Sequence, residues 1–294
     1  MHPAIKAMLS QYDKMKTIED EKNALKEIIQ KICLVGLHRK NFFEKAAFFG
    51  GTALRIIYNL ERFSEDLDFC LDEKDPDFRW IDYKEAVLDE LKTYGFEAEF
   101  EPKKDNSESA VGSSFIKKST LRVLILIESK GKTSREERLK VRLEIDKTNP
   151  EGATYEMPII YQPEVVQIKT LDRPSLFAGK MHAIIARHYN NNVKGRDYFD
   201  LLFYLKGGVK INLHYLENKL KDSGHFAASG VLTEERLREI YLEKIASVDF
   251  KQAIKDVAPY ISSRQRDGLK SWSAPFFSAM APQLMGSEPS TRNA

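Results

Sequence analysis

Two aspartates, Asp66 and Asp68, stand two positions apart in the alternating segment DLDFCL, residues 66–71. In a β-strand these side chains share one face, about 7 Å apart along the backbone, while Leu67 and Phe69 share the other. Two carboxylates so placed can bind one hard cation at about 2.1 Å, and Mg²⁺ suits oxygen ligands at that distance. The spacing therefore predicts a magnesium site on the acidic face of this strand.

A Gly-Gly-Thr motif, Gly50, Gly51 and Thr52, lies between an apolar run at residues 46–49 and a helix-period segment at residues 53–60. Glycines let backbone N–H groups approach a polyphosphate, and a threonine at a helix start adds a hydroxyl and the positive end of the helix dipole. We predict that this motif binds the phosphates of a nucleotide. The plainer alternatives are a strand-to-helix turn for the motif and solvated carboxylates for the two aspartates.

A third carboxylate is needed if two metal ions are to share the site and a proton is to leave an attacking hydroxyl. The segment KVRLEIDK, residues 140–147, alternates and places Arg142, Glu144 and Asp146 on one face of a predicted strand. Glu144 and Asp146 are both candidates for this role. The alternative is that both acids pair with Arg142 or with solvent.

These motifs together resemble a known signature. Gly-Gly-Thr followed across a helix by RFSEDLDF, residues 62–69, is similar to the nucleotidyltransferase signature of the polymerase-beta-like superfamily, and most closely to the AbiEii/AbiGii toxin family. The later segment at residues 171–202 resembles downstream motifs of that family, so the likeness spans about residues 48–205. It favours Glu144 as the third acid, because this strand is similar to an Arg/Lys-x-Glu-Ile pattern. Asp146, on the same face, is a departure from the family pattern, and the choice between the two acids stays open.

The resemblance implies a magnesium-dependent enzyme that moves NMP from an NTP to an acceptor hydroxyl. It further implies the toxin of a bacterial toxin-antitoxin or phage-defence system, with a cognate antitoxin and a nucleic acid such as tRNA as acceptor. Two alternatives stay open: a protein nucleotidylating enzyme, whose acceptor is a protein hydroxyl, and a non-catalytic module that binds NTP or RNA.

Further candidate residues follow the acidic strand region. Lys180 lies in a predicted helix at residues 176–189, where small neighbours leave it space to reach a triphosphate. By resemblance, Asp197 and Asp200 correspond to an acidic motif needed for activity, and one of them would orient Lys180 or Arg196, since a carboxylate beside a phosphate requires an intervening cation. The alternatives are an exposed helix lysine and, for Asp197, a residue favoured by the helix dipole.

Arg62 and Ser64 stand just before the acidic strand, where they would order the loop or contact the nucleotide. Two basic patches, residues 130–142 and 194–196, would contact a nucleic-acid backbone or simply solvate loops.

Composition is that of an ordinary soluble chain: 294 residues, 42% hydrophobic, with a net charge of +2. No apolar run approaches the roughly 20 residues that span a bilayer, and the N-terminus lacks a signal-peptide pattern, so we expect a cytoplasmic protein. Cys33 and Cys70 are expected to be reduced and buried. The six histidines show no zinc-type spacing, which argues against a histidine-metal enzyme.

The periodicities predict an α/β (α+β) fold, a nucleotidyltransferase-like mixed sheet with flanking helices and a helical C-terminal lobe. The first lobe would be residues 1–150 and the second residues 151–294, with a disordered tail from about residue 285. Helices are expected at residues 4–16, 19–37, 81–94 and 176–189, then from residue 195, with two or three more between 209 and 260. Strands are expected at residues 46–49, 66–71, 96–101, 120–129, 140–147 and 164–170.

Overall fold

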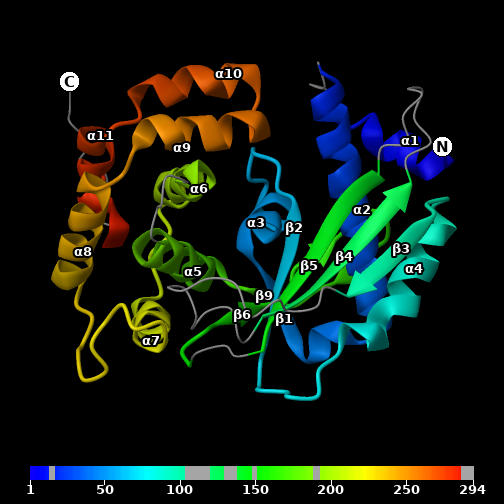
Figure 1. Cartoon of the computed structure of the whole chain (residues 1–294), viewed down its shortest axis with the longest axis horizontal. Helices are drawn as coiled ribbons and strands as arrows, with labels where there is room; N and C mark the ends of the chain where they lie inside the picture. The colour runs from blue at the N-terminus through cyan, green and yellow to red at the C-terminus, as the bar shows by residue number, and fades with distance from the viewer. Residues whose placement is uncertain (13–16, 103–119, 129–137, 148–150, 188–192, 286–294) are drawn as a thin grey trace. The chain divides into compact units, whose positions relative to one another are not determined.

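The computed structural model describes residues 1–12, 17–102, 120–128, 138–147, 151–187 and 193–285 (Figure 1). The chain divides into two compact units. The first comprises residues 1–59, 63–149 and 155–170, and the second comprises residues 60–62, 150–154 and 171–294. The chain thus enters the second unit briefly at residues 60–62 and again at 150–154, whereas one boundary near residue 150 was expected.

The first unit is built on a mixed sheet. Its helical elements are α1 (Pro3–Leu9), α2 (Ile18–Arg39), η1 (Phe42–Glu44), α3 (Gly50–Tyr58), η2 (Trp80–Tyr83) and α4 (Lys84–Thr93). Its strands are β1 (Ala46–Phe49), β2 (Asp66–Leu71), β3 (Ala98–Pro102), β4 (Thr120–Glu128), β5 (Arg138–Asp146), β6 (Tyr155–Glu156), β7 (Ile159–Ile160) and β8 (Val166–Gln167), together with the first residue of β9 (Thr170–Leu171).

Seven strands form the main sheet in the order β3-β4-β5-β2-β1-β9-β6, and β7 and β8 form a separate pair. Strands β2 and β5 are parallel, while β1 is antiparallel to β2 and β4 is antiparallel to β5. The predicted mixed α/β fold is confirmed. The expected strand at residues 164–170 is instead divided, because residues 166–167 pair with β7 whereas residue 170 pairs with β1.

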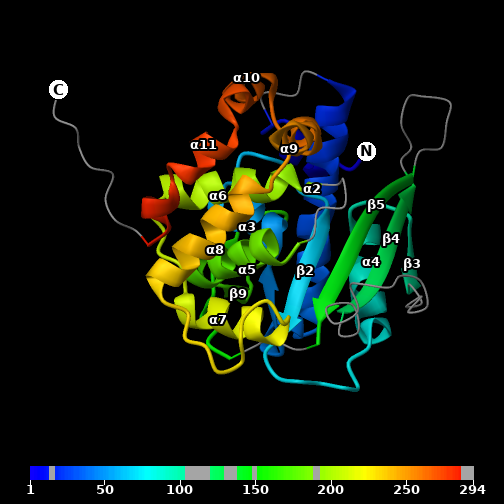
Figure 2. The ribbon, with the colours of Figure 1, turned by 60° about the vertical axis from the view of Figure 1, so that its left-hand side comes forward.

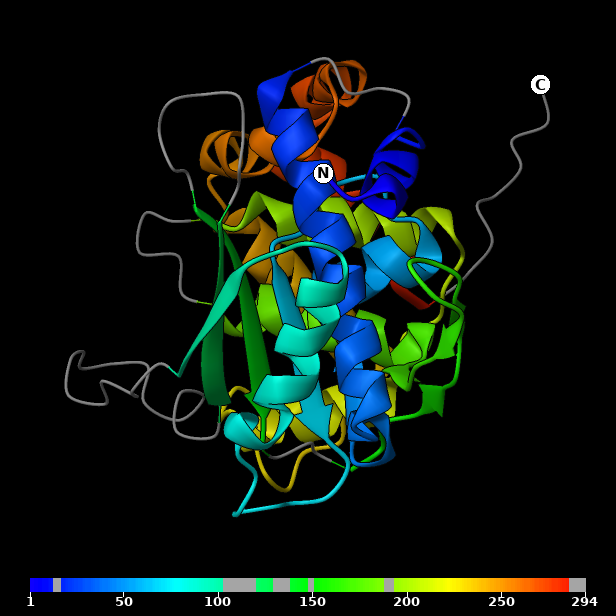
Figure 3. The same ribbon diagram turned by 90° about the vertical axis from the view of Figure 1, so that its right-hand side faces the viewer.

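One face of the sheet carries the core of the first unit. The apolar side chains that alternate along β2, β4 and β5 are buried: Leu67, Phe69, Val123, Ile125, Val141, Leu143 and Ile145. Helices α2 and α4 lie side by side over this face (Figure 3). Alternation then places Asp66, Asp68 and Glu144 on the opposite face.

The helix expected at residues 19–37 runs through Gly36 and ends at Arg39 as α2. A Cβ at Gly36 would lie 2.8 Å from the carbonyl oxygen of Ala86 and 2.9 Å from the Cα of Val87. The glycine therefore serves the close approach of α2 and α4 and does not break the helix.

The second unit is mostly helical. Its elements are α5 (Arg173–Ala186), α6 (Gly195–Lys206), α7 (Leu213–Asp222), α8 (Glu234–Ala246), α9 (Phe250–Val257), η3 (Ala258–Tyr260), α10 (Ser263–Arg266), η4 (Asp267–Ser271), α11 (Ala274–Ser278) and η5 (Ala281–Met285). Helix α5 packs against α6 and α7, and α6 packs against α9.

Helix α5 begins at Arg173, before the start at residue 176 that was expected. Its N-cap is Asp172, whose Oδ1 accepts a hydrogen bond of 2.9 Å from the backbone N–H of Ser175. Proline is well tolerated in the first helical turn, so Pro174 lies inside the helix and not before it. The hydroxyl of Ser175 instead accepts from the backbone N–H of Thr154 at 3.0 Å.

Two smaller predictions can be placed on the described residues. Cys33 and Cys70 are buried free thiols. In the described part of the chain, no helix has the length and apolar character needed to cross a membrane. The predicted disordered tail and most of the basic patch at residues 130–142 lie outside the described residues.

Candidate active site

The predicted acids of the first unit lie on neighbouring strands. In the parallel pair β2 and β5, Asp68 is the register partner of Glu144, and Asp66 is the register partner of Arg142. Figure 2 shows these two strands side by side. Because register partners point to the same side of a sheet, Asp66, Asp68 and Glu144 share one face.

Two arginines lie among these acids. The Nη1 atom of Arg142 is 3.4 Å from Oδ2 of Asp66 and 3.6 Å from Oε1 of Glu144. The Nε atom of Arg122, on β4, is 3.0 Å from the same Oε1 of Glu144. These contacts link Asp66, Arg142, Glu144 and Arg122 in a series of alternating charge, and Asp68 lies beside Glu144 on the same face.

Within the described residues, no three side chains of histidine, cysteine, aspartate or glutamate are grouped closely enough to hold a metal ion. Like charges repel, so carboxylates on one face spread apart unless a cation lies between them. Here the cation between Asp66 and Glu144 is the guanidinium of Arg142. The oxygen donors themselves are the type that Mg²⁺ prefers.

Asp146, the other candidate for the third acid, has a different environment. It is the register partner of Cys70 and accepts a 2.6 Å hydrogen bond from the hydroxyl of Thr120. Of the two alternatives, Glu144 is therefore the one beside Asp68.

The glycine motif contacts the acidic strand directly. Gly50 has φ +81°, and a Cβ built on it would lie 2.5 Å from Oδ2 of Asp68. Only glycine leaves this space to the carboxylate. The first glycine of the Gly-Gly-Thr motif therefore lies against the carboxylate of Asp68 in the first unit.

The motif forms the first turn of α3, which has no capping side-chain hydrogen bond from a described residue. Thr52 is fully buried, and its hydroxyl donates to the carbonyl oxygen of Asp66. This contact fixes the start of β2, so the hydroxyl that was predicted to contact phosphate is already in use. Gly51 is also buried, and it has only backbone atoms with which to contact a phosphate.

Arg62 and Ser64 both hold the loop before β2. Arg62 is buried, and its Nε and Nη2 atoms each donate to one carboxylate oxygen of Asp200 at 2.6 Å. The carbonyl oxygen of Ser64 accepts from the side-chain amide of Gln30 at 3.1 Å. Of the two roles considered for Arg62, the contacts correspond to ordering the loop.

The second unit contains a buried ionic cluster around Lys180. The Nζ atom of Lys180 is 2.8 Å from Oδ1 of Asp197 and 2.8 Å from Oδ2 of Asp200. Arg187 also pairs with Asp197. Lys180 was predicted to have open space around it, but it is held between two carboxylates, and its side chain is only 13% exposed.

The charges of this cluster stabilise one another. Burial by itself would raise the pKa of Asp197, but the charges of Lys180 and Arg187 outweigh it and the pKa is lowered. Burial would lower the pKa of Lys180, but Asp197 and Asp200 raise it. Both groups therefore remain charged near neutral pH.

The two acids of α6 are buried together with apolar residues of the same helix. Asp197, Asp200 and Tyr204 are all buried, and they lie at helical spacing. Sequence reasoning paired these acids with Lys180 but missed Arg187 and the link to Arg62. These partners could have been sought only from the general rule that buried carboxylates pair with cations. Arg196, the other predicted partner, instead lies 3.5 Å from Asp256 and covers the ring of Tyr260.

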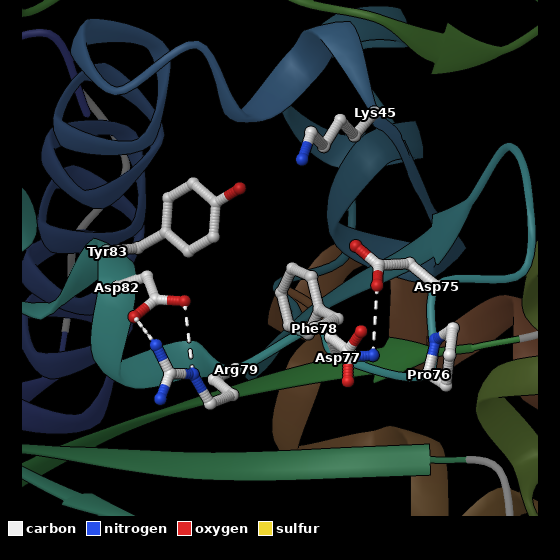
Figure 4. A pocket seen from close by; sticks show the side chains of 8 residues that line it. All are labelled: Lys45, Asp75, Pro76, Asp77, Phe78, Arg79, Asp82 and Tyr83. Carbon is white, nitrogen blue, oxygen red and sulfur yellow. Dashed lines mark hydrogen bonds and ion pairs between the residues drawn. The ribbon is translucent and has the colours of Figure 1, made fainter.

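A separate cavity of about 530 Å³ lies near Leu71, at the end of β2 that is farther from the acids. Its lining residue Lys45 directly precedes Ala46, which pairs with Leu71, whereas Phe49 pairs with Asp68. Its lining residues are Lys45, Asp75, Pro76, Asp77, Phe78, Arg79, Asp82 and Tyr83 (Figure 4). Arg79 is turned onto Asp82, at 2.9 Å. This cavity contains none of the predicted site residues.

Comparison with known proteins identifies the family. Residues 32–274 match the family model described as nucleotidyl transferase AbiEii toxin, type IV TA system. The chain belongs to this family. The matched range includes the Gly-Gly-Thr motif, the acidic strand and the Lys180 cluster, so the predicted resemblance to AbiEii is confirmed.

Two solved structures resemble this AbiEii member at low identity. The structure of JHP933 from Helicobacter pylori has 20% identity, covers 90% of this chain and 92% of its own, and has a TM-score of 0.48. A second solved structure, provisionally described as a nucleotidyltransferase from H. pylori, has 20% identity, covers 87% of this chain and 93% of its own, and has a TM-score of 0.43. No curated protein sequence matches the chain.

Proposed function

We propose that this AbiEii family member is a magnesium-dependent nucleotidyltransferase that moves NMP from an NTP to a hydroxyl of an RNA acceptor such as tRNA. The observation that carries the proposal is the placement of Asp68 beside Glu144 on parallel strands, with Gly50 against the carboxylate of Asp68. Nucleotidyl transfer requires a turn that binds phosphate and acids that bind metal, and the residues that would supply both lie in the first unit.

Asp66, Asp68 and Glu144 are the residues that would hold Mg²⁺, with Asp146 as the alternative to Glu144. When bound, Mg²⁺ would neutralise the phosphate charge and lower the pKa of the attacking hydroxyl. The backbone of Gly50 and Gly51 would contact the phosphates of the NTP at the start of α3.

In the proposed reaction the acceptor hydroxyl oxygen forms a bond to the α-phosphorus, and the bond from that phosphorus to the β-phosphate oxygen breaks. The hydroxyl proton passes to the carboxylate of Glu144, and pyrophosphate leaves with the electron pair of the broken bond. Catalysis of this kind depends mainly on positioning and on neutralised charge.

Roles for Lys180, Asp197 and Asp200 are proposed from the family resemblance. Their mutual ion pairs support a positioning role for the two aspartates, which keep the lysine charged. Arg196, which lies near Asp256, is retained as a contact for the nucleotide or for the acceptor backbone.

The biological role proposed is that of a toxin in a phage-defence system, opposed by a cognate antitoxin. Type IV toxin-antitoxin membership of the family supports this role. Exposed Lys140, on the same face of β5 as Arg142 and Glu144, supports a polyanionic acceptor, because lysines beside an active site attract a phosphate backbone.

The test is to incubate the purified protein with magnesium and each α-labelled NTP, adding total tRNA, a cell lysate or neither. We expect label on RNA from the wild type and none from Asp68→Asn. Label on protein bands would replace the RNA acceptor with a protein hydroxyl. NTP binding without transfer to any acceptor would contradict the enzymatic proposal in favour of a binding module.

A further inference from the structure

Arg142 occupies the place on the acidic face where a cation is needed. Its Nη1 atom lies within 3.6 Å of both Asp66 and Glu144, and its register position is directly beside Asp66. We propose that Arg142 is the resident counter-ion of the metal site, which holds Asp66 and Glu144 before Mg²⁺ binds and is displaced when it does. This inference rests on the proposed function, since it requires that these acids bind metal.

The contacts of Arg142 are those of a displaceable partner. Distances of 3.4 and 3.6 Å are longer than a well-formed charged hydrogen bond, and its side chain is 40% exposed. Ion pairs of this kind contribute little to stability. The buried Arg62 in the second unit, with two contacts of 2.6 Å to one carboxylate, shows how a permanent arginine pair differs.

Displacement by a divalent ion is physically favourable. Mg²⁺ carries two charges and approaches carboxylate oxygens to about 2.1 Å, whereas a guanidinium carries one charge and stays at its longer distance. Glu144 also keeps a second partner, because Arg122 lies 3.0 Å from the same oxygen. Loss of the Arg142 contacts therefore does not leave the glutamate without a cation while the metal enters.

Arg142 is in this view a positioning residue that competes with the metal, and its removal should tighten metal binding. Most substitutions near a metal site weaken it. An increase in affinity is therefore a signature that a merely structural role of Arg142 would not produce.

The test is the affinity of the full-length protein for Mn²⁺ alone, measured by electron paramagnetic resonance or calorimetry, with no nucleotide present. We expect Arg142→Gln to bind Mn²⁺ about tenfold more tightly than the wild type, which corresponds to about 1.4 kcal/mol. The matched control is Lys140→Gln, which removes one positive charge from the same face of β5, two residues away. Screening should limit its effect to about twofold.

The outcomes separate this inference from the function beneath it. Equal affinities for the wild type and Arg142→Gln, or equal gains for Arg142→Gln and Lys140→Gln, would overturn the counter-ion role. Mn²⁺ binding that is unchanged in Asp68→Asn would instead show that the acids are not the metal site, and the proposed function would fail with it.

Discussion

Gly50→Ala is the most informative single change in the first unit. Gly50 has φ +81°, where a residue with a Cβ costs about 1–2 kcal/mol. The new Cβ would also lie 2.5 Å from Oδ2 of Asp68 and 3.2 Å from its Cβ and Cγ. Since Oδ2 is the end of a rotatable side chain, we expect the carboxylate to turn away while the fold survives.

Gly95→Ala is the matched control. Gly95 has φ +79° and also belongs to the first unit, but a Cβ there would have no atom within 4 Å. Both variants should therefore lose about 1–2 kcal/mol of unfolding free energy, with the melting temperature lowered by about 2–8 °C. Only Gly50→Ala should change the site.

The assay is Mn²⁺ affinity beside a thermal melt for each variant. We expect Gly50→Ala to bind Mn²⁺ at least about tenfold more weakly than Gly95→Ala, because misplaced ligands and their supports cost about 10–100-fold in metal affinity. Equal Mn²⁺ affinities in the two variants, at equal stability, would refute the reasoning that Gly50 sets the position of the Asp68 carboxylate.

Three further predictions concern stability. Arg62→Met should lower the unfolding free energy, measured in urea, by about 3–5 kcal/mol, because it leaves the buried carboxylate of Asp200 without its main partner. The control Arg79→Met breaks an exposed pair with Asp82 and should cost at most about 1 kcal/mol. Similar losses in the two variants would contradict the argument from burial. Gly36→Ala should destabilise the protein by about 1–3 kcal/mol, because the new Cβ would meet the backbone of α4. Gly179→Ala, where a Cβ has open space, should stabilise it by up to about 1 kcal/mol. Thermal melts in which both variants are more stable than the wild type would exclude the close contact between α2 and α4. Burial lowers the pKa of His182 to about 3, so below pH 6.5 the unfolded chain binds a proton that the folded chain excludes. Between pH 7 and pH 5 the wild type should therefore lose about 2 kcal/mol of unfolding free energy relative to His182→Gln, as measured by urea titrations. Parallel pH profiles of the two proteins would disprove this prediction.

Local patterns predicted the first unit's sheet well. The alternation in residues 66–71 and 140–147 places apolar side chains inward and acids outward, and both strands are present with those faces. Alternation of this kind indicates a strand with one buried face, so such a strand can be predicted without knowing its contacts with distant residues. The pairing of Asp68 with Glu144 depends on strand order and register, which periodicity alone does not determine.

The ionic contacts were less predictable for the same reason. Arg62 and Asp200 are 138 residues apart, and neither has a neighbour in sequence that indicates the other. The acidic face of α6 was equally hard to place, because charged helix faces are normally solvated and here Asp197 and Asp200 are buried by ion pairing. The role of Gly36 was equally hard to predict, because a glycine near a helix end indicates termination as readily as close packing.

The central claim is that Asp68 and Glu144 form the catalytic metal site, and pyrophosphate release from an NTP tests it most directly. We predict that Asp68→Asn and Glu144→Gln each lower the magnesium-dependent rate by about 100-fold or more, while Asp146→Asn, whose carboxylate accepts from Thr120, retains most of it. Pyrophosphate release that survives both Asp68→Asn and Glu144→Gln would contradict the account.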